Sequence, residues 1–311
     1  DFYIFNKAIN FRDEIKPKLP SWLEKKILIK TETEKKSFYN SILLEPRFDI
    51  AINLMKYSRE DIKNKLKKHN IICSYTKNST VGITINNRIP NNTLIKIKSD
   101  MFEVQDEGSQ LMTLLIGVQT NMKILDMCAG KGTKTILMSN LLKSEGFITA
   151  SDKIKERLGV LKNRVKELKL KNINFDFDVK NQSQFDLVLC DVPCSGIGTW
   201  RRRPENIIWL KNEELEKLKL VQSNILFDAA KLCKVGGKIA YITCSLLYDE
   251  NEFQIKSFLN NFKNFDVINF RQDIQKYLKK EIIKYNKYGL TLPPDILNTD
   301  GYFISMLKKT A

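Results

Sequence analysis

The chain has 311 residues, of which 42% are hydrophobic, and it carries a formal net charge of +16 at pH 7. This content can fill the core of one large domain, or of a catalytic domain and a smaller one. We expect no membrane partner, because no apolar run approaches the roughly 18 residues that a membrane-spanning helix needs. The charge favours a polyanionic partner, although lysine is abundant along the whole chain.

Cysteine and histidine usage excludes several chemistries. The six cysteines are Cys73, Cys128, Cys190, Cys194, Cys233 and Cys244. None forms a CxxC pair, so we expect no metal site. Without a secretory pattern, a chain of this size is expected to keep its thiols reduced in the cytoplasm. The only histidine, His69, lies in a lysine-rich stretch, which disfavours Ser-His and Cys-His mechanisms.

The first 100 residues read as two units. Residues 1–45 are predicted to be helical and amphipathic, and Pro46 breaks that pattern. Residues 46–100 are predicted to form a small α+β module, with a strand-like run at 48–54 and then a helix capped by Ser58. Short strands are expected near 71–75, 81–85 and 94–98.

From 101 to 311 the pattern is that of a doubly wound α/β domain. The expected strands lie at 123–127, 147–151, 173–177, 185–190, 238–243 and 301–307. The expected helices lie at 133–143, 153–168, 212–233 and 249–261. Several of the strands are continuous apolar runs, as in a buried parallel sheet.

A loop of small residues follows the first of these strands and is the candidate cofactor site. Its members are Cys128, Ala129, Gly130, Lys131, Gly132, Thr133 and Lys134. Small residues let the backbone turn tightly against a ligand. The GxGxxG spacing is absent, which disfavours a nicotinamide cofactor and suits S-adenosyl-L-methionine, a cofactor with no pyrophosphate.

Three acidic residues extend this hypothesis. Asp152 ends the second strand, where an acidic residue roughly 20 positions beyond the glycine loop binds ribose hydroxyls. It is equally suited to cap the helix that follows. After the third strand, Asp178 is the candidate for an adenine-side contact and Asp176 is its competitor.

The candidate chemical site lies at the next two strand ends, where Asp191 and Cys194 follow one strand and Cys244 follows the other. Ligands bind at the carboxyl ends of such strands. Buried free cysteine is common, and we accept that interpretation for Cys190 and Cys233. For Cys194 and Cys244, the position at two strand ends favours a functional interpretation.

This pattern suits methylation of cytosine at C5, which is too weakly nucleophilic to take a methyl group directly. A cysteine thiolate that adds to C6 activates C5, and a base then removes the C5 proton. A protonated Asp191 is the expected hydrogen-bond donor to N3 of the cytosine. The target cytosine must also be unstacked into the pocket. Chemistry alone does not rank Cys244 above Cys194 as the nucleophile.

A run of three arginines, Arg201, Arg202 and Arg203, follows the fourth strand. Arginine is less easily explained by compositional bias than lysine. We therefore expect this run to contact RNA phosphates. The alternative is a solvated loop.

At these motifs the chain resembles the RsmB/NOL1/NOP2/Sun family of RNA cytosine-C5 methyltransferases. The resemblance covers roughly residues 100–308. Its blocks are 104–110, the cofactor loop, 191–195, 202–205, Trp209, 222–223, 236–237, 243–245, 249–252 and 298–303. It implies a Rossmann-like class I methyltransferase domain at 101–311 with a mostly parallel seven-stranded sheet. It also implies an RNA-binding module at 46–100 and a remnant of a NusB-like domain at 1–45.

The resemblance also implies roles for individual residues. Cys244 is then the nucleophile and Cys194 assists product release, with Asp191 in the catalytic site. The implied cofactor contacts are the loop from Cys128 to Lys134, Asp152, Asp178 and Asp191. The loop departs from the family pattern at Gly130, Lys131 and Thr133. The expected substrate is rRNA of the small subunit, the alternatives being tRNA or a non-catalytic role in ribosome assembly, and we expect a monomer.

Overall fold

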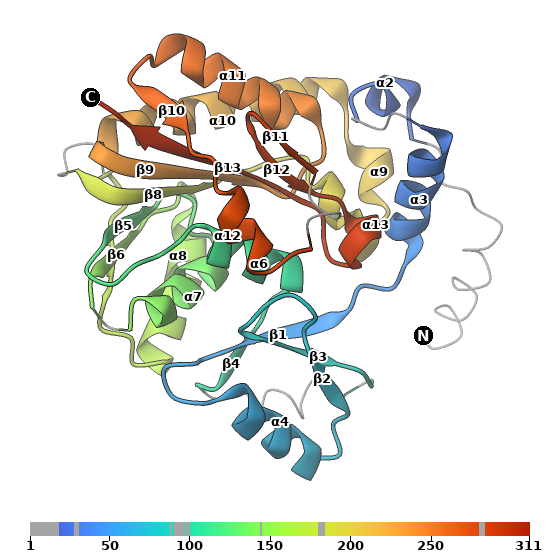
Figure 1. Cartoon of the computed structure of the whole chain (residues 1–311), viewed down its shortest axis with the longest axis vertical. Helices are drawn as coiled ribbons and strands as arrows, with labels where there is room; N and C mark the ends of the chain where they lie inside the picture. Colours follow the sequence, from blue (N-terminus) through green and yellow to red (C-terminus); the bar gives the residue numbers. More distant parts are fainter. Residues whose placement is uncertain are drawn as a thin grey trace.

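The computed structural model describes residues 19–27, 31–87, 89, 97, 100–143, 145–179, 184–279 and 284–311. Two sheets form the framework of this part of the chain, one of nine strands and one of four. The smaller sheet, with helix α4, lies at one end of the molecule (Figure 1). Of the expected helical segment, residues 1–18 and 28–30 lie outside the described residues.

The large sheet has a parallel centre. Its strands are β5 (Lys123–Asp126), β6 (Phe147–Ala150), β7 (Ile173–Phe175), β8 (Phe185–Asp191), β9 (Cys233–Thr243), β10 (Phe265–Val267), β11 (Lys284–Asn286), β12 (Gly289–Leu292) and β13 (Tyr302–Lys309). The order is β11-β12-β13-β9-β8-β5-β6-β7, with β10 paired to β13. Strands β5 to β9 are mutually parallel. The strand order reverses between β5 and β8, and ligands bind at such a point.

The expected α/β fold with a mostly parallel main sheet is confirmed, but the expectation of seven strands was wrong. Nine strands occur among the described residues. The strands that the sequence did not predict are β10, β11 and β12. Each has three or four residues, and none is a continuous apolar run like the one in β8.

Two layers of helices cover the large sheet (Figure 1). One layer contains α6 (Glu107–Leu115), α7 (Thr133–Leu141) and α8 (Lys155–Glu167), and the other contains α10 (Asn212–Leu232) and α11 (Glu252–Asn261). Along β8, Leu187 and Leu189 join the core under α7, whereas Val188 and Cys190 join the core under α10. This alternation has period two, so the sequence also determines which face each residue at a strand end occupies.

The small sheet is antiparallel and has the order β2-β3-β1-β4. Its elements are β1 (Phe48–Ile52), α4 (Arg59–Lys68), β2 (Cys73–Tyr75), β3 (Gly82–Ile85) and β4 (Phe102–Val104). Ser58 and Asp61 form the capping box of α4. Strand β4 pairs with β1, so this sheet extends past the expected boundary at residue 100. The expected strand at 94–98 lies outside the described residues, apart from Ile97.

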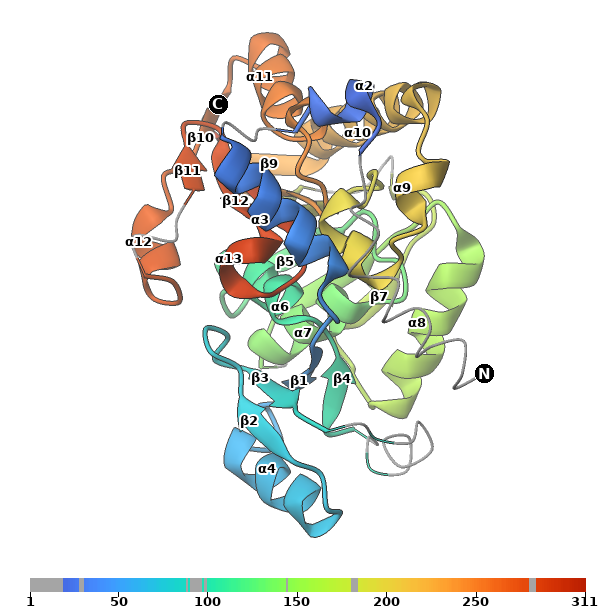
Figure 2. The ribbon, with the colours of Figure 1, turned by 90° about the vertical axis from the view of Figure 1, so that its right-hand side faces the viewer.

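The N-terminal helices pack on the large domain. Helices α2 (Ser21–Glu24) and α3 (Glu32–Leu43) contribute Leu23 and Phe38 to a buried cluster that includes Trp200 and Leu247. Helix α3 lies beside α13 (Pro294–Leu297), as Figure 2 shows. The described part of residues 1–45 is therefore an extension of the large domain's core. No helix in the described part of the chain is long and apolar enough to cross a membrane.

Candidate active site

Three neighbouring strands end at the same edge of the large sheet. Asp126 at the end of β5 pairs with Leu189, and Asp191 at the end of β8 pairs with Ile242 of β9. Cys244 directly follows β9 and packs against the core under α7. By the alternation of period two, Asp126, Asp191 and Cys244 all lie on the α7 face.

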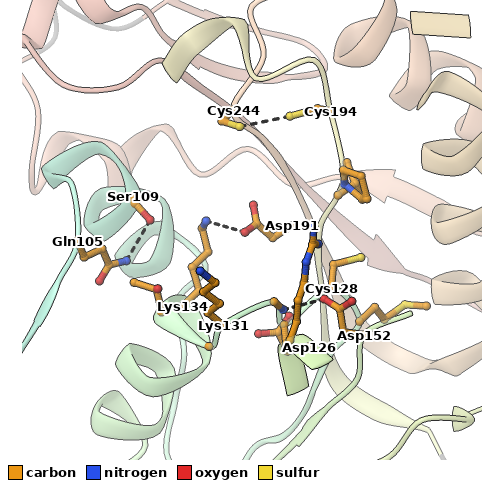
Figure 3. A pocket seen from close by; sticks show the side chains of 18 of the residues that line it. Gln105, Ser109, Asp126, Cys128, Lys131, Lys134, Asp152, Asp191, Cys194 and Cys244 are labelled. Carbon is orange, nitrogen blue, oxygen red and sulfur yellow. Dashed lines mark hydrogen bonds and ion pairs between the residues drawn. The ribbon is translucent and has the colours of Figure 1, made fainter. Parts of the chain in front are cut away.

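A cavity of about 860 Å³ opens at this edge. Figure 3 shows the two cysteines at one end of it, Asp126 and Asp152 at the other, and Lys134 with Asp191 between them. All the residues of the predicted cofactor loop line the cavity, as do Asp152, Asp191, Cys194, Cys244 and Arg202. The structure thus brings together most of the residues that the sequence analysis singled out.

The backbone of the cofactor loop depends on its glycines. Gly130 and Gly132 have φ of +55° and +86°, in the left-handed region that favours glycine. A Cβ on Gly132 would also lie 1.9 Å from Cδ1 of Leu161. Gly132 is the N-cap of α7, so the turn directs Thr133 and Lys134 into the first turn of that helix.

Asp152 braces the loop from the end of β6. Its Oδ2 accepts a hydrogen bond from the N–H of Gly130 at 2.8 Å, and its Oδ1 accepts one from the N–H of Ile154 at 2.8 Å. Helix α8 begins at Lys155 with Ile154 as its N-cap, so the carboxylate closes the turn before the helix and is not its cap. Asp152 combines this turn with a position on the cavity wall.

Asp178 lies apart from this arrangement. Its side chain is exposed, its backbone N–H donates to Oδ1 of Asp176 at 2.9 Å, and neither residue lines the cavity. Residues 180–183, which follow, lie outside the described residues. In this structure the adenine-side contact expected of Asp178 is therefore not placed at the cavity.

Asp126 is a residue of the cavity wall to which the sequence analysis gave no role. It is 1% exposed, and its Oδ2 accepts a hydrogen bond from Oγ1 of Thr135 at 2.7 Å. Its Oδ1 is buried without a partner among the described residues. Burial raises the pKa of this carboxyl to about 7. An acidic residue at the end of an apolar strand was the signal that could have found it.

Lys134 reaches from α7 to Asp191, and its Nζ donates to Oδ2 at 2.7 Å. Burial acts to lower the pKa of Lys134, but Asp191 and then Cys244 raise it above its ordinary value. Asp191 accepts this hydrogen bond through Oδ2, and its expected role as a donor to N3 of the cytosine stays a prediction. The donor of this pair is the Lys134 ammonium, which the sequence analysis placed only in the cofactor loop.

Cys194 and Cys244 meet at the end of the cavity, where their Sγ atoms lie 3.3 Å apart. Both side chains are half-buried. The hydrogen bond to Cys244, burial and then the charge of Glu250 raise the pKa of the Cys194 thiol. By contrast, Cys244 faces Lys134. Cys190 and Cys233, expected to be buried, are both fully buried.

The arginine run is divided between interior and surface. Arg201 is 3% exposed, and its guanidinium bonds to Asp106 and Asp300 at 3.0 and 2.7 Å. The expected phosphate contact is therefore wrong for Arg201, because the two acids hold it inside the fold. Arg202 bonds to the same acids but is partly exposed and lines the cavity, and Arg203 is exposed.

The doubly wound sheet and the glycine loop after its first parallel strand define a class I methyltransferase fold. A solved structure of PH0851 has a TM-score of 0.83 and 25% identity, over 94% of this chain and 66% of that chain. NSun6 from Pyrococcus horikoshii, solved with SFG, has a TM-score of 0.75 over 90% of this chain and 95% of that one. At 19% identity, this second likeness shows the fold alone.

A family model described as 16S rRNA methyltransferase RsmB/F matches residues 112–308, and the chain belongs to this family of S-adenosyl-L-methionine-dependent methyltransferases. The ribosomal RNA small subunit methyltransferase B of Photorhabdus laumondii is 30% identical over 93% of this chain. The probable counterpart from Bacillus subtilis is 30% identical over 66% of this chain. The chain spans 66% and 47% of the length of these two relatives.

Proposed function

We propose that the protein methylates C5 of a cytosine in small-subunit rRNA with S-adenosyl-L-methionine as the methyl donor. The observation that carries the proposal is the meeting of Cys194 and Cys244 at 3.3 Å, beside the Lys134–Asp191 pair in one cavity. Methylation of C5 through a covalent adduct uses a cysteine nucleophile, a second cysteine and a cation, and this cavity contains all three. Membership of the RsmB/F family supports the choice of rRNA.

The residues at the other end of the cavity fit the cofactor. Gly130 leaves room for close approach to the backbone, because a Cβ there would meet only the carbonyl of Cys128 at 3.9 Å. Asp152 stands where ribose hydroxyls are bound in related folds. The buried and unpartnered Oδ1 of Asp126 is an acceptor that suits a donor or cationic group. The bound cofactor would supply an electrophilic methyl group.

Electrostatics rank the two cysteines in the same order as the family does. Burial acts to lower the pKa of Lys134, but Asp191 and then Cys244 raise it, so an ammonium group stands near the Cys244 sulfur. Glu250 instead raises the pKa of Cys194, after the larger effects of the Cys244 hydrogen bond and burial. Cys244 is therefore the better nucleophile and Cys194 the better proton-bearing partner.

The covalent steps follow from this ranking. The Cys244 thiolate forms a bond to C6 of the target cytosine, and the electron pair of the C5–C6 double bond becomes available at C5. Lys134 lies within reach to stabilise the negative charge that develops on the cytosine ring. After methylation a base takes the C5 proton, the bond from Cys244 to C6 breaks, and the thiolate leaves. Cys194 assists release by hydrogen bonding to this leaving sulfur.

The RNA would enter between the two sheets. The cavity is lined by Arg47 and Phe48 near the start of β1 as well as by Arg202 of the large domain. Phe48 is 39% exposed, and an exposed ring beside arginines suits an unpaired base and its phosphates. A target cytosine has to leave its stack to reach Cys244 at the inner end.

The test is transfer of a labelled methyl group from the cofactor to 16S rRNA and, separately, to tRNA, followed by nucleoside mass spectrometry. We expect 5-methylcytosine in 16S rRNA, matched by its loss from the rRNA of cells that lack the gene. Methylation of tRNA alone would replace the substrate proposed here. Binding of the cofactor without transfer to either RNA would contradict the proposal.

A further inference from the structure

Glu250 is a buried carboxylate that the reaction scheme leaves unused. It ends η3 (Tyr248–Glu250) and is 0% exposed. Its Oε1 accepts a hydrogen bond from the backbone N–H of Ser195 at 2.8 Å and one from Nε2 of Gln222 at 2.9 Å. Its Oε2 accepts hydrogen bonds from the hydroxyls of Ser195 and Ser245.

These contacts join the two turns that carry the cysteines. Ser195 directly follows Cys194, and Ser245 directly follows Cys244. The serine hydroxyls lie 3.1 Å apart, and the adjacent cysteine sulfurs lie 3.3 Å apart. Two Cys-Ser dipeptides from different strands are thus held side by side, with one carboxylate shared between their serines.

The carboxylate is itself fixed in place. The hydroxyl of Tyr241 donates to the backbone carbonyl of Glu250 at 2.6 Å. Gln222 also donates to the carbonyl of Pro193 at 2.9 Å, which precedes Cys194. A buried carboxylate is costly unless donors satisfy it, and the four donors stabilise the Glu250 carboxylate at this position.

We propose that Glu250 is a positioning residue that holds Cys194 and Cys244 at reacting distance and keeps Cys194 as the proton-bearing partner. This proposal rests on the proposed function, because it assigns these roles within the same site.

The second part of the proposal, that Glu250 keeps Cys194 protonated, follows from the negative charge of the Glu250 carboxylate. The titratable groups that act on Cys194 are Cys244, Glu250 and Tyr241, and a tyrosine is neutral near neutral pH. The backbone N–H of Gly196 acts in the opposite direction and lowers the pKa of Cys194. The pKa of Cys194 is raised by the Cys244 hydrogen bond, by burial and by the charges of Cys244 and Glu250. Removal of the Glu250 charge should therefore let Cys194 lose its proton at lower pH.

Two substitutions separate the effect of the length of the Glu250 side chain from the effect of its charge. Glu250→Gln keeps the length of the side chain but removes the charge, whereas Glu250→Asp keeps the charge but draws the oxygens back by one methylene. The matched control is Glu252→Gln. Glu252 is also buried, at 4% exposed, but it accepts a hydrogen bond from Asn286 and touches neither cysteine turn.

The first measurement is alkylation of each thiol by iodoacetamide as a function of pH, followed by peptide mass spectrometry. In Glu250→Gln we expect the profile of Cys194 to move to lower pH, with a smaller movement in Glu250→Asp and none in Glu252→Gln. This measurement needs no RNA, so it tests the proposal even if the substrate has been assigned wrongly. An unchanged Cys194 profile in Glu250→Gln would overturn it.

The second measurement is turnover. A misplacement of about 1 Å can lower a rate roughly 100-fold, so we expect kcat of Glu250→Gln and Glu250→Asp to fall by about that factor with unchanged cofactor affinity. A loss of unfolding free energy with unchanged kcat would show a merely structural role. If neither variant folds, Ser195→Ala and Ser245→Ala each remove one donor, and unchanged alkylation and turnover in both would contradict the proposal.

Discussion

The Sγ atoms of Cys194 and Cys244 lie 3.3 Å apart, yet the two sulfurs face opposite charges. Cys244 faces the ammonium of Lys134, and Cys194 faces the carboxylate of Glu250. The pair is therefore electrostatically asymmetric before any substrate arrives. This asymmetry gives a physical reason for two cysteines so close together to perform different steps.

The first prediction concerns these two thiols. Cys244→Ala should abolish both methyl transfer and the covalent protein–RNA adduct, because no sulfur remains to attack C6. Cys194→Ala should instead accumulate the adduct, because release of the product loses its assistance. Denaturing gel electrophoresis with labelled RNA and the cofactor distinguishes the two. Cys73→Ala, at a half-buried thiol in the small sheet, is the control and should behave as wild type.

An adduct that accumulates in Cys244→Ala and is missing from Cys194→Ala would reverse the assignment. That result would also mean that the charges around the pair do not decide which sulfur attacks.

The second prediction concerns Lys134. Lys134→Met keeps most of the side chain but removes the cation that bonds to Asp191 at 2.7 Å. We expect kcat to fall by about 10²–10³-fold, which is typical of the loss of a donor that stabilises developing charge. Lys155→Met, at an exposed position on α8, is the control.

If Lys134→Met weakens cofactor binding but leaves single-turnover chemistry unchanged, Lys134 serves only the cofactor loop. That was the role assigned to it from sequence.

The convergence of the cysteines could be predicted because parallel strands place their carboxyl ends at one edge. Strands β5 and β6 begin where the sequence predicted and end one residue earlier. The alternation along β8 and β9 was readable as well, and it puts Asp191 and Cys244 on one face. The sheet order was not readable, because no local pattern states which strands are neighbours.

Other features depended on partners far away in the chain. Arg201 belongs to a run that reads as a surface patch, but Asp106 and Asp300 pair with it inside the fold. Asp191 at the end of β8 pairs with Lys134, which comes from helix α7. Glu250 stood in a block of the family resemblance without an assigned role, and only the tertiary fold brings both serines to it.

The third prediction concerns Asp126 and the pH dependence of stability. Its pKa is raised from 3.8 to about 7 by burial, so the folded chain binds more protons than the unfolded chain between those pH values. The free energy of unfolding should therefore fall as pH rises through this window. A shift of this size corresponds to roughly 4 kcal/mol. Asp126→Asn still accepts the Thr135 hydrogen bond and should flatten that part of the profile.

Chemical denaturation of the cofactor-free protein at a series of pH values measures this effect. Asp228→Asn, at an exposed carboxylate on α10 that pairs with Lys231, should leave the profile unchanged. A wild-type profile that rises across the window would contradict the raised pKa.

The fourth prediction separates the three arginines. Arg203 is exposed, so Arg203→Ala should weaken RNA binding and reduce the slope of log affinity against log salt by about one. Arg201→Ala should instead lower the free energy of unfolding by about 3 kcal/mol, because Asp106 and Asp300 lose their fully buried cation and keep only the partly exposed Arg202.

Fluorescence anisotropy with an rRNA fragment at several salt concentrations, together with thermal unfolding, measures both effects. Lys276→Ala, at an exposed lysine beside α12 (Arg271–Gln275), is the control. If Arg201→Ala lowers the salt slope without loss of stability, Arg201 reaches the RNA in solution despite its ion pairs. If Arg203→Ala leaves the slope unchanged, the phosphates do not pass Arg203 and follow the cavity rim at Arg202 instead.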